Sequence, residues 1–562
     1  MKDIKKNEKE RYLKKAKKLY EKAVKEKNKN QELLSECLEL SFPSNDRLNS
    51  TLTKDSSMED KTVSQYDDTV KIASRRMVNY IADTLTPAGQ LWAYFDINVK
   101  YDGENETADA DQSKAVRTVG NVVTDAVFKE INDSNAHNPL YQSYENFVGG
   151  GTGAVKLLEM PPFSKRATQT KNLPLDRLYY LEDTFEFPEF VMYKHIEEDI
   201  QMLYDLFGKT RVILDPAMEM LTEEQRENEE YNFIEGCILL EHKQASDEYL
   251  HFMTNENFDH FYFTEILDYN PFTVYRWSRP SDNHVWGVPI SMSMVANIRT
   301  LNESVELEMK KSRLMLNPPM AGVMEPSYMP FMDAETMSSQ VVYEAGKITF
   351  MNGVTQIYPI ITSYDMQMSA VNSEQIRNTI YSMYNVNPLG DVQNTRYRTA
   401  EEMALRHQEF SKQFAPTYGR MMNEFMGPYL RKLAKILQKR NRIPLDADQK
   451  KLIKDSEIVY VNPLTKLAAQ EEIQNAINFK MMMSKVLDPE IFQVLFDDIE
   501  FAFDAATKLN IAAKVLNDKE EVIKGLEQLQ AEKQAMMQQA MMQQGMPQQQ
   551  GAGPEQGGGV IG

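Results

Sequence analysis

Apolar residues recur at three- and four-residue steps in several long segments, which is the spacing of one face of a helix. The clearest such segment runs from Val70 to Leu85 and stops at Thr86-Pro87. Pro289 stands at a favoured helix start, and Asn317-Pro318-Pro319 cannot continue that helix. We therefore expect helices over residues 1–40, 70–85, 112–132, 196–207, 289–316, 366–384, 399–442 and 466–535.

The pattern changes in the middle of the chain, where short apolar runs rich in β-branched and aromatic residues alternate with polar turns. The expected strands are 154–158, 179–181, 190–193, 234–241, 249–252 and 261–266. Residues 318–362 are also typical of strands and turns. The chain is thus predicted to be an α+β protein. Its 562 residues exceed what one hydrophobic core usually serves, so we expect several lobes.

Charge is distributed unevenly along the chain. The net charge is −20, whereas residues 1–30 hold 13 Lys/Arg against 5 Asp/Glu. The remaining residues therefore carry −28 (−20 minus +8). A body this acidic repels a phosphate backbone and is not that of a general nucleic-acid binder, although it would let DNA slide without sticking. The Gly/Pro/Gln-rich residues 543–562 cannot build a core and are expected to be disordered.

Two patterns suggest ligand chemistry but lack its requirements. The run Gly149–Lys156 resembles a phosphate-binding loop, yet Leu157 stands where Ser or Thr is needed, and a strand is expected to follow. We expect a tight turn instead. His242, His251 and His260 are nine residues apart, a spacing that does not converge on a metal, and are expected to lie at a surface or line a sheet. No catalytic, cofactor or metal site is predicted.

The cysteines, the longest apolar runs and the start of the chain indicate the cellular compartment in which the protein works. Cys37 and Cys237 stand far apart, which predicts two buried thiols and a reducing environment rather than a disulfide framework. No run of about 18 apolar residues is present, so we expect no membrane partner. The Lys-rich start has no apolar segment of the kind found in secretory signals.

Several motifs follow one another in order over roughly residues 40–525. They are Ile81–Pro87 with Leu91-Trp92 and Phe95, Gly151–Ala154 before Leu173–Leu175, Pro271–Trp277, Trp286–Pro289, Leu301-Asn302, Asn317–Pro319, Thr399–Arg406, Phe414–Pro416 with Arg420 and Glu424, and Val461–Leu464. Together they resemble the head-to-tail connecting, or portal, proteins of podovirus-type bacteriophages. The chain departs from that pattern at Phe185–Pro188, where Gly is frequent, and at Trp286 and Val288, where Tyr and Arg are more usual. The basic N-terminal helix and the Gln-rich tail lie outside the resemblance.

The resemblance implies a portal fold and a twelve-subunit ring. In such a fold, each subunit has an α/β wing, a two-helix stem, a small α/β clip, a long bent wing helix and a helical crown. Pro416 and Pro428 are expected to cause the bend. The implied divisions are a basic N-terminal helix (1–40), wing (41–288), stem helix 1 (289–316), clip (317–366), stem helix 2 (367–385), tunnel loop (386–397), long wing helix and return (398–465), crown (466–535) and disordered tail (536–562).

The resemblance also assigns candidate sites. The tunnel loop would grip or gate DNA through Val386, Asn387, Pro388, Leu389, Gly390, Asp391, Val392 and Gln393. Without the resemblance, this segment would read as a surface turn. Lys310, Lys311 and Arg313 are candidate phosphate contacts in the lumen, or partners for acidic residues of a neighbouring subunit. The clip would meet the packaging motor and later the tail through Met329, Pro330, Phe331 and Met332.

The function implied is that of a conduit at one capsid vertex, through which DNA is packaged and ejected. The partners implied are further copies of the chain, the terminase large subunit, the major capsid protein, the scaffold, a tail adaptor, internal core proteins and double-stranded DNA without sequence specificity. Assembly in the host cytoplasm and a final place in the virion follow. Two alternatives are a scaffold or internal core protein, which would lack the β-rich regions, and a nucleic-acid-processing enzyme, which would need a nucleotide-binding loop.

Overall fold

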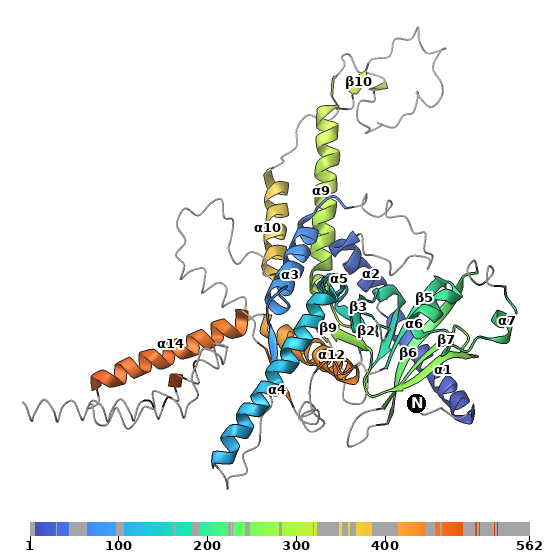
Figure 1. The fold of residues 1–562 in the computed structure, drawn as a ribbon. Helices are drawn as coiled ribbons and strands as arrows, with labels where there is room; N and C mark the ends of the chain where they lie inside the picture. The colour runs from blue at the N-terminus through green and yellow to red at the C-terminus, as the bar shows by residue number, and fades with distance from the viewer. Residues whose placement is uncertain are drawn as a thin grey trace, which may run out of the picture. The chain divides into compact units, whose positions relative to one another are not determined.

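The fold is known from a computed structural model, which divides the chain into two units, Met1–Tyr460 and Val461–Gly562 (Figure 1). It describes residues 6–29, 31–43, 65–96, 106–161, 164–182, 190–222, 226, 229–241, 248–279, 284–318, 320–322, 348–350, 358–359, 367–384, 414–443, 456–460, 463–486, 501–502, 505, 522 and 525. The second unit contains α14 (Pro463–Val486), which begins three residues before the expected crown (466–535). All other elements named below belong to the first unit.

A five-stranded antiparallel sheet has the order β4-β5-β6-β7-β8. The strands are β4 (Leu178–Leu181), β5 (Phe190–Glu198), β6 (Tyr231–Glu241), β7 (Glu248–Asn255) and β8 (Phe261–Leu267). Helix α1 (Lys6–Asn28) packs its apolar stripe on a cluster that includes Ile234 and Leu250. Helix α6 (Ile200–Phe207) and the short helix α7 (Pro216–Glu219) contribute to a second cluster around Phe233 and Met253. The sheet therefore buries apolar side chains on both of its faces.

Several of the expected helices have different bounds in the structure. The helix expected at 112–132 begins already at Glu106, and the one expected from 289 begins at Val295 after a 3₁₀ turn. Residues 1–40 contain two helices, α1 and α2 (Gln31–Ser41), instead of one. The helix expected at 196–207 begins only at Ile200, because β5 continues to Glu198. Asp199 caps its start, accepting a hydrogen bond of 3.0 Å from the Met202 amide.

The second sheet has the order β3-β2-β9 and lies against helix α5. Its strands are β3 (Thr168–Asn172), β2 (Thr152–Glu159) and β9 (Phe272–Arg276), and the 3₁₀ turn η3 (Leu175–Arg177) follows β3. Helix α5 (His137–Gly150) was not expected from the sequence. It ends at Gly151, whose φ of +73° is the left-handed conformation typical of a helix C-cap. Within the run Gly149–Lys156, the first two glycines therefore end a helix, Gly151 makes the turn, and β2 begins at Thr152. The turn into a strand was predicted correctly, whereas the helix before it was not expected.

Further helices complete this body. Helix α3 (Thr69–Leu85) packs on α5, and helix α4 (Glu106–Asp133) packs on β1 (Ala93–Asp96). Strand β1 pairs with β13 (Glu457–Tyr460), which lies more than 350 residues further along the chain. Residues 414–421 are helical, Met422–Met426 form a π-helical segment, and α12 (Gly427–Lys439) follows. Of the expected helix 399–442, the residues before 414 lie outside the described part.

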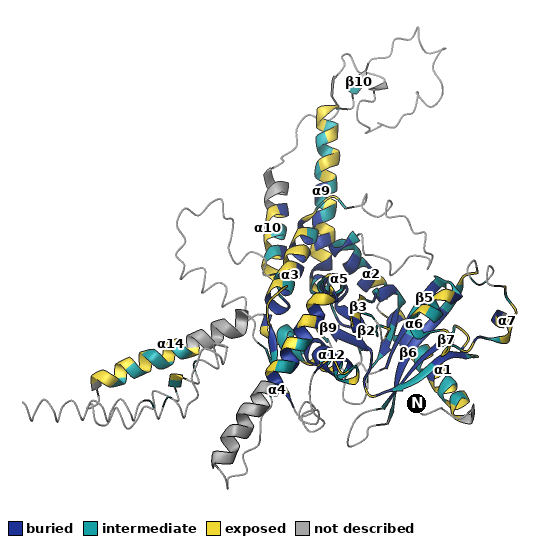
Figure 2. Ribbon diagram, viewed as in Figure 1, coloured by how far each residue is buried: buried dark blue, intermediate teal, exposed yellow. Residues whose placement is uncertain are grey.

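Helices α9 and α10 contact each other (Figure 1), and we call this helix pair the stem, after the division to which the resemblance assigned it. After the 3₁₀ turn η4 (Ile290–Met294), α9 runs over Val295–Leu316, and α10 spans Gln367–Met383. Between them, the described residues form three very short paired strands, β10 (Met320–Gly322), β11 (Ile348–Phe350) and β12 (Tyr358–Pro359). The two sheets and the surrounding helices hold most of the buried residues (Figure 2), which include Cys37 and Cys237 as free thiols, as predicted. The mixture of helices and sheets is the α+β class expected.

Candidate functional site

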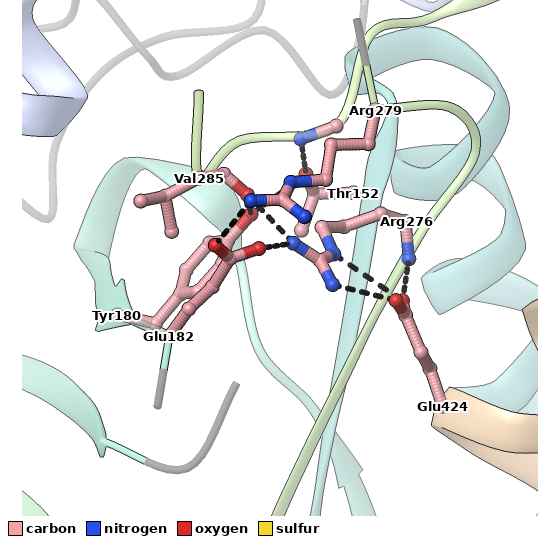
Figure 3. A network of polar contacts seen from close by, with 8 residues as sticks. Thr152, Tyr180, Glu182, Arg276, Arg279, Val285 and Glu424 are labelled. Atoms are coloured by element: carbon pink, nitrogen blue, oxygen red, sulfur yellow. Dashed lines mark hydrogen bonds and ion pairs between the residues drawn. The ribbon is translucent and has the colours of Figure 1, made fainter. Parts of the chain in front are cut away.

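Arg276 lies at the centre of a buried ionic network at the end of β9 (Figure 3). Its Nη2 donates to Glu424 Oε1 at 2.6 Å, its backbone amide donates to Glu424 Oε2 at 2.9 Å, and its Nη1 pairs with Glu182. Arg279 Nη2 donates to the other oxygen of Glu182 at 3.0 Å. Arg276 is only 2% exposed, so these carboxylates compensate a charge that water cannot reach.

The network joins segments that are far apart in the sequence. Glu424 is part of the π-helical segment, and Phe425 beside it stacks on Tyr275, with 4.5 Å between ring centroids. Glu182 follows β4 of the five-stranded sheet. Arg276 therefore connects β9, the end of β4 in the five-stranded sheet and the π-helical segment. Such a hub fixes the relative placement of these elements, because an ion pair outside water is sensitive to small displacements.

The backbone that enters the stem passes closely over the end of α5. A Cβ on Gly287 would lie 2.0 Å from the Gly151 carbonyl oxygen, and a Cβ on Gly151 would lie 2.5 Å from the Pro289 nitrogen. The Gly287 amide also donates to Thr152 Oγ1 at 3.1 Å. Only glycine allows this approach, so the start of the stem is held against the β2 turn at a fixed distance.

Aromatic packing supports the same junction. Tyr180 donates to the Val285 carbonyl at 3.0 Å, and its ring lies 4.8 Å from that of Trp286. Burial raises the pKa of Tyr180 well above its usual range, so this hydroxyl stays protonated and remains a donor. Trp286 differs from the residue more usual in the resembled pattern, and in this chain it packs on Tyr180.

The base of the stem is held by a second set of polar contacts. Asn302 on α9 accepts from the Tyr66 amide at 2.7 Å, and Arg377 on α10 donates to Asp67 at 2.9 and 3.0 Å. Ser373 donates to Glu308 at 3.2 Å between the two helices. Both stem helices are thus tied to the residues that open α3, which sets the direction in which the stem leaves the body.

The two halves of α9 differ in burial. Val295, Ile298, Leu301 and Val305 are buried in the first half. In the second half, Leu307, Met309, Met315 and Leu316 are 47–88% exposed. A helix with its apolar side chains open to water is typical of a surface that another protein covers.

The three cations predicted as phosphate contacts lie in the last two turns of α9. Lys310 and Arg313 are exposed, and Lys311 is partly buried. Lys310 pairs with Glu306 at 2.6 Å, one helical turn away. Cations near the C-terminal end of a helix also interact favourably with its dipole, so their position has a local electrostatic reason in addition to any ligand.

Two predicted sites lie outside the described residues. These are the tunnel loop Val386–Gln393 and the clip residues Met329–Met332. The sequence did not single out the Arg276 network, although Arg276 and Glu424 both stand in the motifs quoted above. The signal in the sequence was that a positive charge, Arg276, and a negative charge, Glu424, each stand next to aromatic residues in those motifs.

A second buried ionic cluster connects the two sheets. Lys156 on β2 pairs with Glu235 on β6, which also accepts from His195 at 2.9 Å and from His251 at 2.7 Å. Burial alone would raise the pKa of Glu235, but Lys156 and the two imidazole donors together hold it well below its usual value. Burial lowers the pKa of His195. His251 thus lines a sheet, as predicted, and its partner is a carboxylate.

The chemistry of these groups is structural. Each carboxylate of the two clusters is satisfied by protein donors, and among the described residues no group of His, Cys, Asp or Glu is arranged to hold a metal ion. No helix in the described ranges is long and apolar enough to cross a membrane. The described contacts hold the stem helices at their base, and the apolar side chains in the second half of α9 remain exposed.

Comparison with known proteins shows the family to which the chain belongs. Residues 13–516 match the family described as bacteriophage head to tail connecting protein. A search of curated proteins gave no match. Among solved structures, a chain from the virion of a native gene transfer agent particle is similar, with a TM-score of 0.30 and 12% identity over 75% of this chain and 98% of that one. The identification rests on the family match.

The match first defines a class, the structural proteins of bacteriophage particles. Within that class, the chain belongs to the head-to-tail connecting, or portal, protein family. It is thus a virion protein that assembles with capsid and tail. The match also corrects one expectation. It begins at residue 13 and ends at residue 516, so most of the basic N-terminal helix lies within the family region, whereas residues 1–12 and 517–562 lie outside it.

Proposed function

We propose that twelve copies of the chain, from a podovirus-type phage, form a ring at one capsid vertex. DNA would enter through this ring during packaging and leave through it during ejection. The ring would bind the terminase large subunit first and the tail adaptor afterwards. The two-helix stem of each subunit would line the channel between the wing and the clip.

The observation that carries this proposal is the exposed second half of α9. Leu307, Met309, Met315 and Leu316 would be poorly placed on a subunit that stays alone in water. A ring buries such a surface repeatedly, because each subunit presents it to the next and the arrangement closes on itself. The polar contacts at the stem base would give every subunit the same stem direction, which closure requires.

The tunnel loop is proposed to contact DNA without reading its bases. Asn387-Pro388-Leu389-Gly390 favours an irregular turn, and twelve such loops would narrow the channel. Lys310, Lys311 and Arg313 would interact with passing phosphates. An otherwise acidic lumen would keep DNA from sticking, since a duplex carries about one charge per 1.7 Å.

The clip is proposed as the docking site for the successive partners. Met329, Phe331 and Met332, with Pro330, would supply an apolar contact that the terminase and then the tail adaptor could use in turn. The wing would contact the major capsid protein, the scaffold during assembly in the host cytoplasm, and internal core proteins.

The experiment that tests this proposal is negative-stain imaging of the purified full chain together with measurement of its mass. We expect rings with a central hole and a mass near twelve subunits. A stable monomer or dimer, even when scaffold protein is supplied, would contradict the ring and return attention to the scaffold and core-protein alternatives.

A further inference from the structure

Helix α1 is fixed firmly to the body by the face that it buries. Ala16 and Ala23 are fully buried against the five-stranded sheet, and Tyr20 packs on Tyr179 with 5.0 Å between ring centroids. Lys27 is buried as well, and its ammonium donates to the carbonyls of Leu175 at 2.9 Å and Leu178 at 3.2 Å. A helix held this way presents its opposite face at a constant position.

The opposite face of α1 is a line of cations. With about 100° of rotation per residue, six of them fall within an arc of about 80° centred opposite Ala16 and Ala23. They are Arg11, Lys14, Lys18, Lys22 and Lys25 on α1, and Lys29, which directly follows its last residue; all of them are exposed. We call this set the basic stripe. From first to last it is about 27 Å long, at 1.5 Å per residue.

Most of these charges are not neutralised by the protein itself. Among the described residues, Lys14, Lys18, Lys22 and Lys25 form no hydrogen bond or ion pair, whereas Lys29 pairs with Glu26. The exposed carboxylates of α1 lie beside the stripe. Figure 2 shows exposed residues along α1, whereas the neighbouring five-stranded sheet is mostly buried.

The chemistry of the stripe favours a polyanion over a protein partner. Protein interfaces have an apolar or aromatic centre and are depleted in lysine. The stripe contains no apolar side chain and five lysines among its six residues. Lysine is a compact point charge suited to phosphate without base reading, and a straight line of such charges fits a regularly charged rod.

We propose that the basic stripe binds the phosphate backbone of double-stranded DNA, without sequence specificity, on the outer surface of the wing. This contact is separate from the proposed channel, and it rests on the proposed function only in that duplex DNA is the polyanion which a connector meets. The rest of the chain is strongly acidic, so the stripe would be where a duplex approaches the outside of the body.

The test uses relaxed, covalently closed circular duplex DNA and the purified full chain. A closed circle has no end to thread into an assembled ring, so binding must occur outside the channel. The stripe variant carries Lys14→Gln, Lys18→Gln and Lys22→Gln. The control variant removes the same charge from exposed lysines elsewhere, through Lys129→Gln, Lys165→Gln and Lys209→Gln.

We expect the unaltered protein to bind the circle at low salt, with an affinity that falls steeply as salt rises. Each lost phosphate contact lowers the slope of log K against log salt by about 0.9, so the stripe variant should be shallower by up to about 2.7. Its affinity near 50 mM salt should fall at least about ten-fold, and that of the control less than about two-fold. Unchanged melting temperatures will show that both variants fold.

Two outcomes would overturn the proposal: no binding of the circle by the unaltered protein, or equal losses in both variants. Either would leave an acidic protein as the partner of the stripe. The mass of each sample keeps the two proposals apart. If a monomer binds the circular DNA through the basic stripe, the DNA-binding proposal is supported and the ring is contradicted. If the protein forms rings that do not bind the circular DNA, only the DNA-binding proposal is contradicted.

Discussion

Arg276 carries a buried charge that two carboxylates from distant segments compensate, and this makes it the most sensitive residue of the junction. We predict that Arg276→Met lowers the free energy of unfolding of the first unit by about 3–5 kcal/mol, because Glu424 loses its cationic partner inside the protein. Denaturant unfolding followed by tryptophan fluorescence would measure this change. The nearby Trp277 and Trp286 give a local signal.

The matched control is Arg299→Met. Arg299 pairs with Glu36, but its side chain is 62% exposed, so water can replace the lost partner. A much smaller effect is expected there. Equal losses in the two variants would show that the Arg276 network has no special role in stability.

The cluster around Glu235 predicts a dependence of stability on pH. The pKa of His195 is lower in the folded protein than its usual value of 6.5, so the unfolded chain binds the proton more readily. His195 therefore contributes stability that is fully present above about pH 6.5 and declines as pH falls. We predict that His195→Gln flattens the decline of the melting temperature between about pH 6.5 and 5.

His260→Gln serves as the comparison for this pH effect. His260 contacts the Ile213 carbonyl, outside the Glu235 cluster. It should leave the pH dependence of the unaltered protein in place. If the melting temperatures of the His195→Gln and His260→Gln variants depend on pH in the same way, His195 is not the group that titrates. Below about pH 4.5, protonation of Glu235 adds a further loss in every variant, because its pKa is lowered in the fold.

At this scale, the sequence predicted what depends on local geometry. The turn into a strand after Gly150 followed from the residues after it, and burial of Cys37 and Cys237 followed from their type and spacing. The partners of Arg276 and Glu235 could not be predicted. They lie 148 and 79 residues away along the chain, and the number of acidic residues leaves the choice open until the fold brings them together.

The stem helices supply the next prediction, at the scale of elements. The second half of α9 exposes Leu307 and Met309 by 57% and 52%. If they contact a neighbouring subunit, Leu307→Gln with Met309→Gln should weaken association at least about ten-fold and leave the melting temperature of the subunit unchanged. Sedimentation velocity over a range of concentrations would measure this effect.

Met220→Gln provides a control with similar chemistry. Met220 is 86% exposed and directly follows α7, which is not one of the two stem helices. Assembly should tolerate this change. A double stem variant that still assembles like the unaltered chain would remove the support that α9 gives to the ring.

Element prediction succeeded where periodicity was long and uninterrupted. Helices α3 and α10 agree with the expected segments to within one residue, and α9 ends as expected but begins only at Val295. All five strands of the five-stranded sheet were located, although β5 and β7 are longer than expected. Helix α5 was missed because its buried face mixes Ser143, Asn146 and glycines with aromatic residues, which hides the apolar period. Strand β3 was missed because Thr168 and Thr170 are its buried residues, and they are polar in type.

For the whole molecule, the order of motifs carried more information than any single pattern. The family match confirms that the chain is a head-to-tail connecting protein, as the motifs indicated, and the matched region extends into the N-terminal helix. The oligomer could not be derived from composition or periodicity. It depends on surfaces such as that of α9, whose exposure becomes visible only when the fold shows which side chains remain uncovered.

The division into two units gives a last prediction. The first unit ends at Tyr460, directly after β13, and has both sheets and their cores within it. A chain that stops after Tyr460 should therefore fold and keep the melting temperature of the first unit. A chain that stops after Ser456 lacks only four further residues, but it removes β13, so β1 loses the strand with which it pairs. It also removes the Tyr460 hydroxyl that donates to the Met422 carbonyl at 3.3 Å beside the π-helical segment.

We expect calorimetry to show a clearly lower melting temperature for the chain ending at Ser456 than for the chain ending at Tyr460. The reason is physical: unpaired backbone groups of β1 would be left next to the buried side chains of Trp92 and Phe95. If both truncated chains melt together, β13 contributes little to the first unit. If both fail to fold, the boundary at Tyr460 is wrong, and residues beyond it belong to the same cooperative unit as the wing.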